Sequence, residues 1–287
     1  MEILIQNKCG VWYRFPQVSK IHFYHSYFNL ITKVALFIIA MFEFFNLNLN
    51  RTNYNNFFMK KITTGVLIVA AGEGVRSKSL IPKQYLHFGK KTVLERNIEN
   101  FLDEPLIDFV KVVINEKHVG YYKETISKID SVKLLPTCFG GKTRSLSVKN
   151  GLEAIANWGC TKILIQDGAR PFTSSEIIRN CIKGLDKFDV VFPGINIPDT
   201  LYIRKKESSR DTIGDLGPNR DSLIRAQTPQ AFRFDYIYEK HMNSSEAYTD
   251  DVSLAFLDKK KIEIISGSEN NFKITTQEDI KIAEKLF

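Results

Sequence analysis

A strand-like apolar run that ends in three small residues constrains the fold of this chain more than any other feature. Residues 66–69 read Val-Leu-Ile-Val, and Ala70, Ala71 and Gly72 follow directly. A β-branched, aliphatic run is typical of a strand buried on both faces, as in parallel sheets covered by helices. The small residues leave room for a flat or anionic ligand to reach backbone N–H groups. The run therefore predicts a parallel α/β sheet with a ligand at the carboxyl end of this strand.

Two cations follow the small residues at short distance. Arg76 comes four residues after Gly72, and Lys83 lies in the segment Pro82-Lys83-Gln84. Fixed positive charges above a backbone turn suit a nucleoside triphosphate that loses pyrophosphate. The spacing lacks the third glycine of a dinucleotide fingerprint and the Gly-Lys-Ser/Thr of a Walker phosphate loop. The glycines alone fit a plain tight turn equally well, so the interpretation depends on motifs further along the chain.

Charge and cysteine usage narrow the class of protein. The net charge is +8, but Lys and Arg are spread among Asp and Glu, so no basic tract with interleaved aromatics points to a nucleic acid. An anionic small-molecule substrate explains the surplus equally well. The four cysteines (Cys9, Cys138, Cys160 and Cys181) form no C-x-x-C pair and no His/Cys ligand cluster. We therefore expect a reduced, cytoplasmic protein without a structural zinc.

Residues 1–58 differ in composition from the rest of the chain. They are rich in Phe, Tyr, Asn, Ile and Leu and almost lack Gly, Asp and Glu. Charged residues bracket the apolar run 34–42 too closely for a membrane-spanning helix, and no small-residue cleavage site follows it. We predict that the true start is Met59, that 1–58 is a non-native or disordered extension, and that 59–287 is the functional domain. A membrane anchor is the less favoured alternative.

Strand and helix patterns alternate from Thr64 onward. Further strands are predicted at 110–114, 132–135, 162–166, 190–192, 200–203 and 262–266. Helices are predicted at 92–103, 117–129, from 141 to about 157, and at 174–187, 235–242, 249–258 and 276–286. This order implies a Rossmann-like, mostly parallel sheet with helices on both faces, which binds ligands at the carboxyl ends of its strands. The hydrophilic segment within 200–226 is either a disordered surface loop or a β-arm that swaps onto a partner subunit.

Six motifs in order carry a resemblance to a known family. They are 70–84, then Gly140-Gly141 with Arg144 and Ser147-Val148, then Asp167-Gly168-Ala169-Arg170-Pro171, Gln227-Thr228-Pro229-Gln230, Thr249-Asp250-Asp251 and 267–275. Over residues 64–287 this pattern resembles the 2-C-methyl-D-erythritol 4-phosphate cytidylyltransferases. The resemblance implies that the phosphate of methylerythritol 4-phosphate attacks the α-phosphorus of CTP and that pyrophosphate leaves. That phosphate is mostly doubly ionised near neutral pH, with a second pKa of about 6, so no protein base is required.

The resemblance also implies residue roles. The catalytic cations are Arg76, Lys83, Lys273 and Arg220. The nucleotide-binding residues are Ala70, Ala71, Gly72, Gly141, Ser147, Asp167 and Gly168. The acceptor-binding residues are Arg170, Thr200, Arg220, Thr228 and Thr249. Asp167 is the expected ligand of Mg²⁺, which takes its other ligands from water and phosphate.

The resemblance further implies a homodimer joined by the segment 200–226. Arg220 and Thr228 resemble a pair that reaches into the neighbouring subunit's site. No nucleic-acid partner is expected, and a membrane partner is not favoured. Because the chain ends soon after Lys273, we expect no fused cyclodiphosphate synthase.

Three positions depart from the family pattern, and rival functions remain open. Lys142 replaces an acidic residue, Asn219 stands where aspartate is common, and 196–199 lacks a basic residue. The nearest rival is a ribitol-5-phosphate cytidylyltransferase, which shares the nucleotide motifs; the intact 267–275 motif favours methylerythritol phosphate. A sugar-1-phosphate nucleotidyltransferase would lack two of the motifs. A non-catalytic nucleotide-binding module would tolerate loss of the three cations at 76, 83 and 273, all of which are present.

Overall fold

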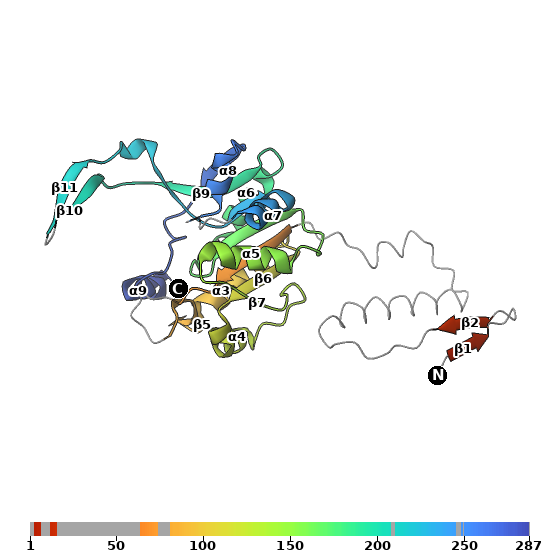
Figure 1. The fold of residues 1–287 in the computed structure, drawn as a ribbon. Helices are drawn as coiled ribbons and strands as arrows, with labels where there is room; N and C mark the ends of the chain where they lie inside the picture. Colours follow the sequence, from red (N-terminus) through yellow and green to blue (C-terminus); the bar gives the residue numbers. More distant parts are fainter. Residues whose placement is uncertain are drawn as a thin grey trace. The chain divides into compact units, whose positions relative to one another are not determined.

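Figure 1 shows the computed structural model of the chain, which describes residues 3–6, 12–15, 64–73, 81–207, 210–244, 248 and 250–286. The chain divides into two units, Met1–Lys60 and Lys61–Phe287. In the first unit, β1 (Ile3–Gln6) and β2 (Trp12–Phe15) pair as antiparallel strands. The rest of the predicted extension 1–58, and the predicted start at Met59, lie outside the described residues.

An eight-stranded sheet forms the centre of the second unit. Its strands follow the order β12-β9-β13-β8-β3-β6-β7, with β14 paired to β9. Their bounds are β3 (Thr64–Ala70), β6 (Phe109–Ile114), β7 (Cys138–Phe139), β8 (Lys162–Asp167), β9 (Val190–Asn196), β12 (Ile224–Ala226), β13 (Gln230–Arg233) and β14 (Ile262–Ser266). Strand β3 is parallel to β6 and β8, β7 to β6 and β14 to β9, whereas β12 and β13 are antiparallel to their neighbours. The predicted mostly parallel sheet is confirmed.

Helices cover both faces of the sheet. They are α3 (Val93–Leu102), α4 (Val119–Ile126), α5 (Arg144–Ala154), α6 (Ser175–Gly184), α7 (Phe234–Asn243), α8 (Val252–Leu257) and α9 (Gln277–Leu286). Successive side chains of β3 point to opposite faces, and its core residues divide accordingly. Val66 and Ile68 pack in the core that includes α3 and α6, whereas Leu67 packs in the core that includes α5 and α7. Helix α3 begins with the predicted capping box, in which Thr92 and Glu95 each accept the other's backbone N–H.

Several local predictions were wrong. The predicted strand 132–135 is only a bridge between Val110 and Leu134, with Val132 fully exposed, and the edge strand β7 forms further along the chain. The predicted helix 117–129 begins as the 3-10 turn Glu116–His118 and continues as the shorter α4. Strand β13, which lies antiparallel between β8 and β9, was not predicted. A short hairpin of β4 (His87–Phe88) and β5 (Lys91–Thr92) was also missed.

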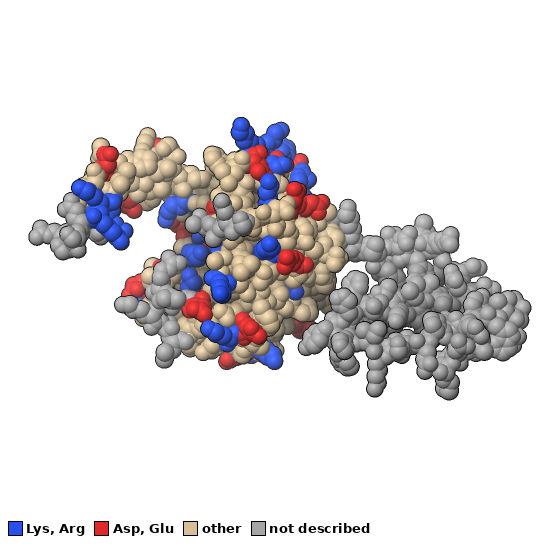
Figure 2. Space-filling model, viewed as in Figure 1, with Lys and Arg blue, Asp and Glu red and all other residues tan. Residues whose placement is uncertain are grey.

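The hydrophilic segment forms a β-hairpin. Strands β10 (Tyr202–Glu207) and β11 (Arg210–Leu216) are antiparallel, and the chain returns through the 3-10 turn Arg220–Ser222 to β12. Figure 1 shows this hairpin projecting away from the central sheet, and Figure 2 shows Lys and Arg side chains near its tip. The β-arm alternative is therefore favoured over the disordered loop, and its role in joining two subunits stays a prediction.

Across the described ranges, no helix combines the length and apolar character that a membrane crossing requires.

Candidate active site

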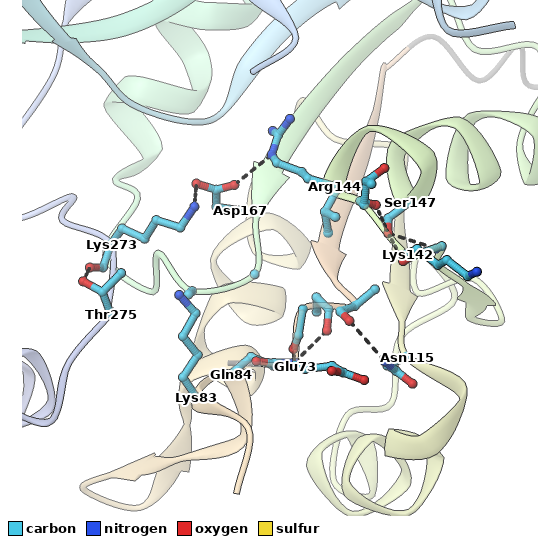
Figure 3. A pocket seen from close by; sticks show the side chains of 18 of the residues that line it. Glu73, Lys83, Gln84, Asn115, Lys142, Arg144, Ser147, Asp167, Lys273 and Thr275 are labelled. Atoms are coloured by element: carbon cyan, nitrogen blue, oxygen red, sulfur yellow. Dashed lines mark hydrogen bonds and ion pairs between the residues drawn. The ribbon is translucent and has the colours of Figure 1, made fainter. Parts of the chain in front are cut away.

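A cavity of about 770 Å³ opens at the carboxyl ends of β3 and β8 (Figure 3). This is where a parallel sheet is expected to bind its ligands. Its lining includes all seven residues predicted for the nucleotide: Ala70, Ala71, Gly72, Gly141, Ser147, Asp167 and Gly168. It also includes the predicted cations Lys83 and Lys273, together with Lys142, which replaces the family's acidic residue. Segments far apart in the sequence thus meet in one place, as predicted.

The turn after β3 is held by a buried glutamine. The side-chain amide of Gln84 donates to the carbonyl oxygens of Ala70 and Gly72 at 2.8 and 2.9 Å. Because Gln84 is fixed in this way, its neighbour Lys83 is held at the edge of the cavity. Sequence reasoning singled out Lys83 and missed the role of Gln84, although both residues belong to the same motif.

Glycines let separate segments close around the turn. A Cβ atom at Gly140 would lie 2.4 Å from Cβ of Ala71, and one at Gly168 would lie 2.9 Å from the carbonyl oxygen of Val69. Both distances are too short for real contacts, so larger residues would push the walls of the cavity apart. The backbone N–H of Gly141 donates to the hydroxyl of Ser147 at 3.0 Å. The side of the cavity that is predicted to hold the nucleotide is therefore tightly packed.

Three cations surround Asp167 at the end of β8. Its Oδ2 lies 2.9 Å from Nζ of Lys273 and 3.4 Å from Nε of Arg170, and its Oδ1 lies 3.4 Å from Nε of Arg144. Burial alone would raise the pKa of this carboxyl. The charges of Lys273, Arg144 and Arg170 outweigh that cost and hold the pKa well below its usual range. Arg144 was noted within a motif, but its pairing with Asp167 was not predicted.

Lys273 reaches Asp167 because its loop is tied to the segment after β8. Ile274 donates its backbone N–H to the carbonyl oxygen of Ala169 at 2.9 Å. The guanidinium of Arg170 donates to the carbonyl oxygen of Asn271 at 2.8 Å. The fully buried side-chain amide of Asn271 donates to the backbone carbonyl oxygen of Thr228 at 2.9 Å. The motif at 267–275 therefore lies against the motif at 167–171, as one site requires.

Thr228 is bonded within its own chain through its hydroxyl. It is buried within its own chain, where its hydroxyl accepts the backbone N–H of Asp167 at 3.0 Å and donates to Oε1 of Gln166 at 2.7 Å. These bonds hold the Thr228 hydroxyl behind Asp167 within one chain, and its predicted reach into a neighbouring subunit's site stays a prediction. Thr228 supports β8 at the site instead of contacting the cavity.

The remaining predicted residues that the structure describes do not line the cavity. Arg220 and Thr200 are exposed near the base of the arm, where the guanidinium of Arg220 donates to the carbonyl oxygen of Pro198 at 2.6 Å. Arg76 and Thr249 lie outside the described residues, so their predicted roles stay predictions. The described part of one chain therefore brings together the nucleotide residues and leaves the arm residues apart.

The carboxylates that line the cavity are Asp167 and Glu73. Within the described ranges, no three His, Cys, Asp or Glu side chains are grouped as metal ligands. This donor set fits Mg²⁺ only where substrate phosphates supply the other oxygens, which is how that ion is usually bound in nucleotide sites.

Comparisons with known proteins agree on one enzyme family. The family model for 2-C-methyl-D-erythritol 4-phosphate cytidylyltransferase matches residues 64–287. A protein with that name from Clostridium botulinum (strain Eklund 17B / Type B) is 39% identical over 223 residues, which cover 77% of this chain and 97% of the relative. A bifunctional enzyme IspD/IspF from Wolbachia pipientis wMel is 39% identical over 230 residues, and the chain spans 56% of that longer relative. The crystal structure of 4-diphosphocytidyl-2C-methyl-D-erythritol synthase from Anaerococcus prevotii DSM 20548 shares 31% identity at a TM-score of 0.66, covering 78% of this chain and 95% of that one.

Proposed function

We propose a reaction for this protein from the premise that the chain belongs to the 2-C-methyl-D-erythritol 4-phosphate cytidylyltransferase family. The protein transfers CMP from CTP to the phosphate of 2-C-methyl-D-erythritol 4-phosphate. It releases pyrophosphate and forms 4-diphosphocytidyl-2-C-methyl-D-erythritol, a step in isoprenoid precursor synthesis. The main structural support is the group of cations around Asp167, which lies beside the small-residue turn in one cavity.

The cavity suits in-line transfer between two anions. An oxygen of the acceptor phosphate forms a bond to the α-phosphorus of CTP, and the bond from that phosphorus to the pyrophosphate oxygen breaks. The acceptor is already ionised, so the protein's task is to align the anions and to neutralise the charge of the transition state. Lys83 and Lys273 both line the cavity and serve that purpose. We assign the same task to Arg76.

Lys273 is the cation around Asp167 best placed to turn toward substrate. Arg144 has a second carboxylate partner in Asp251, and Arg170 has a second partner in the carbonyl of Asn271. Within the described ranges, Nζ of Lys273 is paired with Asp167 alone. When Lys273 turns to a phosphate, the two arginines continue to neutralise Asp167. The Asp167 carboxylate therefore stays neutralised after Lys273 has turned away.

We infer that Asp167 would hold Mg²⁺ together with triphosphate oxygens. The ion, when bound, would offset the charge of the triphosphate and favour the departure of pyrophosphate. Asp167 fits this task because its lowered pKa keeps it ionised and it lines the cavity. Glu73 is the second carboxylate at the cavity and lies on the turn after β3.

We further propose that the arm pairs two copies of the chain. Its exposed apolar side chains are Tyr202, Ile203, Ile213 and Leu216, which are between 52% and 72% exposed. Burial of such residues against a second copy would be favourable. The pairing would bring Arg220 and Thr200 toward the partner's acceptor site. The protein's expected location is the cytoplasm, in keeping with the free thiols of Cys138, Cys160 and Cys181.

Pyrophosphate release tests the reaction, the acceptor and the proposed start together. Residues 59–287 and the full chain are each assayed with CTP and Mg²⁺, with methylerythritol 4-phosphate and ribitol 5-phosphate as parallel acceptors. We expect both chains to release pyrophosphate with methylerythritol 4-phosphate only. Release with ribitol 5-phosphate alone would favour the rival polyol-phosphate enzyme. CTP binding without release by either chain would favour the non-catalytic module, and activity of the full chain alone would assign a function to residues 1–58.

A further inference from the structure

A chain of ionisable groups extends from Arg144, which lines the cavity beside Asp167, to two buried residues that do not line it. It consists of Arg144 at the start of α5, Asp251 just before α8, and His241 in α7. The side chains of Asp251 and His241 are 1% and 2% exposed, and neither residue lines the cavity. Burying charge in this way costs desolvation energy and adds little net stability. A role in the neighbouring site is a better reason for it.

Arg144 connects this chain to Asp167. Its Nε lies 3.4 Å from Oδ1 of Asp167, and its Nη1 lies 2.7 Å from Oδ2 of Asp251. Because the guanidinium is planar and always charged, carboxylates on two of its nitrogens fix its orientation. Figure 3 shows Arg144 and Lys273 approaching Asp167 from opposite sides.

Asp251 is held from two other elements. Its Oδ1 lies 3.0 Å from Nε2 of His241, and its backbone N–H donates to Oε1 of the buried Gln230 in β13 at 3.0 Å. Burial would raise the pKa of Asp251, but Arg144 and His241 outweigh it and lower the pKa. A charged, immobile carboxylate therefore anchors the far side of Arg144.

We propose that Asp251 and His241 are positioning residues for the transfer reaction, acting through Arg144 on Asp167. They keep Arg144 on Oδ1 of Asp167, so that Asp167 stays neutralised while Lys273 turns to a phosphate. This role rests on the proposed function, because it assigns part of the same site. Without Asp251, Arg144 is released to compete with Lys273 for Asp167 or to pair with the triphosphate.

Substitutions along the buried chain test the role kinetically. Asp251→Asn is expected to lower kcat about tenfold or more, with the KM for CTP within about threefold of wild type. His241→Leu is expected to have the same effect, whereas His241→Gln, which keeps a side-chain N–H donor, should restore at least about half of the wild-type kcat. Asp251→Asn combined with His241→Leu should lose no more than Asp251→Asn alone, because both act through one contact.

The matched control is another ion pair beside the same two helices. Lys240, next to His241 in α7, lies 2.6 Å from Asp258 at the end of α8, and this pair touches neither Arg144 nor Asp167. Asp258→Asn should therefore leave kcat at the wild-type level. A loss as large as that of Asp251→Asn would mean that any loosening of α7 and α8 slows the enzyme, which would overturn the specific role.

An NMR readout keeps the inference separate from the proposed reaction. The Nε–H signal of Arg144, assigned by its loss in Arg144→Lys, should shift or broaden in Asp251→Asn and stay in place in Asp258→Asn. A signal that does not respond, or a kcat of Asp251→Asn within about twofold of wild type, overturns the positioning role. If the Arg144 signal responds to Asp251→Asn but the wild-type protein never releases pyrophosphate, the proposed reaction is overturned and the link from Asp251 to Arg144 is kept.

Discussion

The two sides of this site are built in different ways. On the nucleotide side, the turn after β3, the Gly140–Gly141 segment and Asp167 are packed against the sheet and bonded within one chain. On the acceptor side, Thr200 and Arg220 lie at the base of the arm, and the side chain of Arg220 is half exposed. From this comparison we propose that one chain preforms the CTP half of the site and that the acceptor half depends on a second copy.

Lys273 lines the cavity beside Asp167, and its loss should have the largest effect. Lys273→Ala is expected to lower kcat about 1,000-fold, because it removes a cation that neutralises the transition state. Pyrophosphate release under saturating CTP measures the change. The control is Lys281→Ala on the exposed face of α9, which should match wild type. Wild-type turnover by Lys273→Ala would remove Lys273 from the catalytic set.

Arg220 tests whether the acceptor side is shared between subunits. Arg220→Ala is expected to raise the KM for methylerythritol 4-phosphate by about 100-fold while the dissociation constant of CTP stays constant, since only a charged contact to the acceptor phosphate is lost. Calorimetry with CTP and pyrophosphate release at varied acceptor concentration separate the two quantities. Arg225→Ala is the control, because Arg225 pairs with Glu269 close to the same arm.

Mixing variants decides which subunit Arg220 serves. Equal amounts of Lys273→Ala and Arg220→Ala chains are refolded together and assayed at an acceptor concentration well below the raised KM of Arg220→Ala. They should recover about a quarter of wild-type activity if Arg220 acts on the partner's site, because half of the dimers then carry one intact site. If Arg220 acts on its own chain's site, every mixed dimer lacks an intact site. The mixture then stays as inactive as its components.

Gly168 tests the preformed side. Gly168→Ala places a Cβ 2.9 Å from the carbonyl oxygen of Val69 and 3.0 Å from Cα of Ala70, so the backbone must shift. We expect the shifted backbone to reduce the free energy of CTP binding by about 2 kcal/mol. Calorimetry should then show a dissociation constant for CTP that is about 30-fold higher. Gly120→Ala in α4 is the matched control, since its Cβ meets nothing within 4 Å. Equal CTP affinity in both variants would contradict a tightly closed nucleotide side.

The same division explains what the sequence could predict. The residues predicted for the nucleotide line one cavity, and they could be singled out because small residues after a buried strand have a local physical signature. The capping box at Thr92 could also be predicted, because it depends on residues only three positions apart. The antiparallel strand β13 has only four residues, and its place between β8 and β9 depends on long-range pairing that no local pattern encodes.

Side-chain connections were the least predictable part of the site. Arg144 pairs with Asp167 and Asp251, which are 23 and 107 positions away in the sequence, so spacing gave no signal for it. Thr228 was predicted to reach a neighbouring subunit's site, and nothing in its motif indicated that its hydroxyl is buried within its own chain. Its position became clear only from its bonds to Gln166 and Asp167.

The smallest expected effect is the acid dependence that Asp167 gives to folding stability. The pKa of Asp167 is lowered in the folded chain by Lys273, Arg144 and Arg170, which outweigh its burial, whereas an unfolded Asp has a pKa of about 3.9. A group with a lowered folded pKa contributes stability that is fully present above the unfolded pKa and is lost as pH falls toward the folded one. Asp167→Asn removes this contribution, so the melting temperatures of wild type and variant should differ by a constant amount between about pH 7 and pH 5.

Below about pH 4, the difference in the free energy of unfolding between wild type and Asp167→Asn should narrow by about 1 kcal/mol for each pH unit. This corresponds to about 3 °C in the difference of their melting temperatures. Asp130→Asn, which changes an exposed carboxylate on the loop after α4, should show no such narrowing. If the difference in melting temperature between wild type and Asp167→Asn widens as the pH falls, the three cations do not stabilise the Asp167 carboxylate. The preformed side would then owe its order to close packing at Gly140 and Gly168 rather than to charge, and a Gly168→Ala variant should lose CTP binding equally at pH 5 and pH 7.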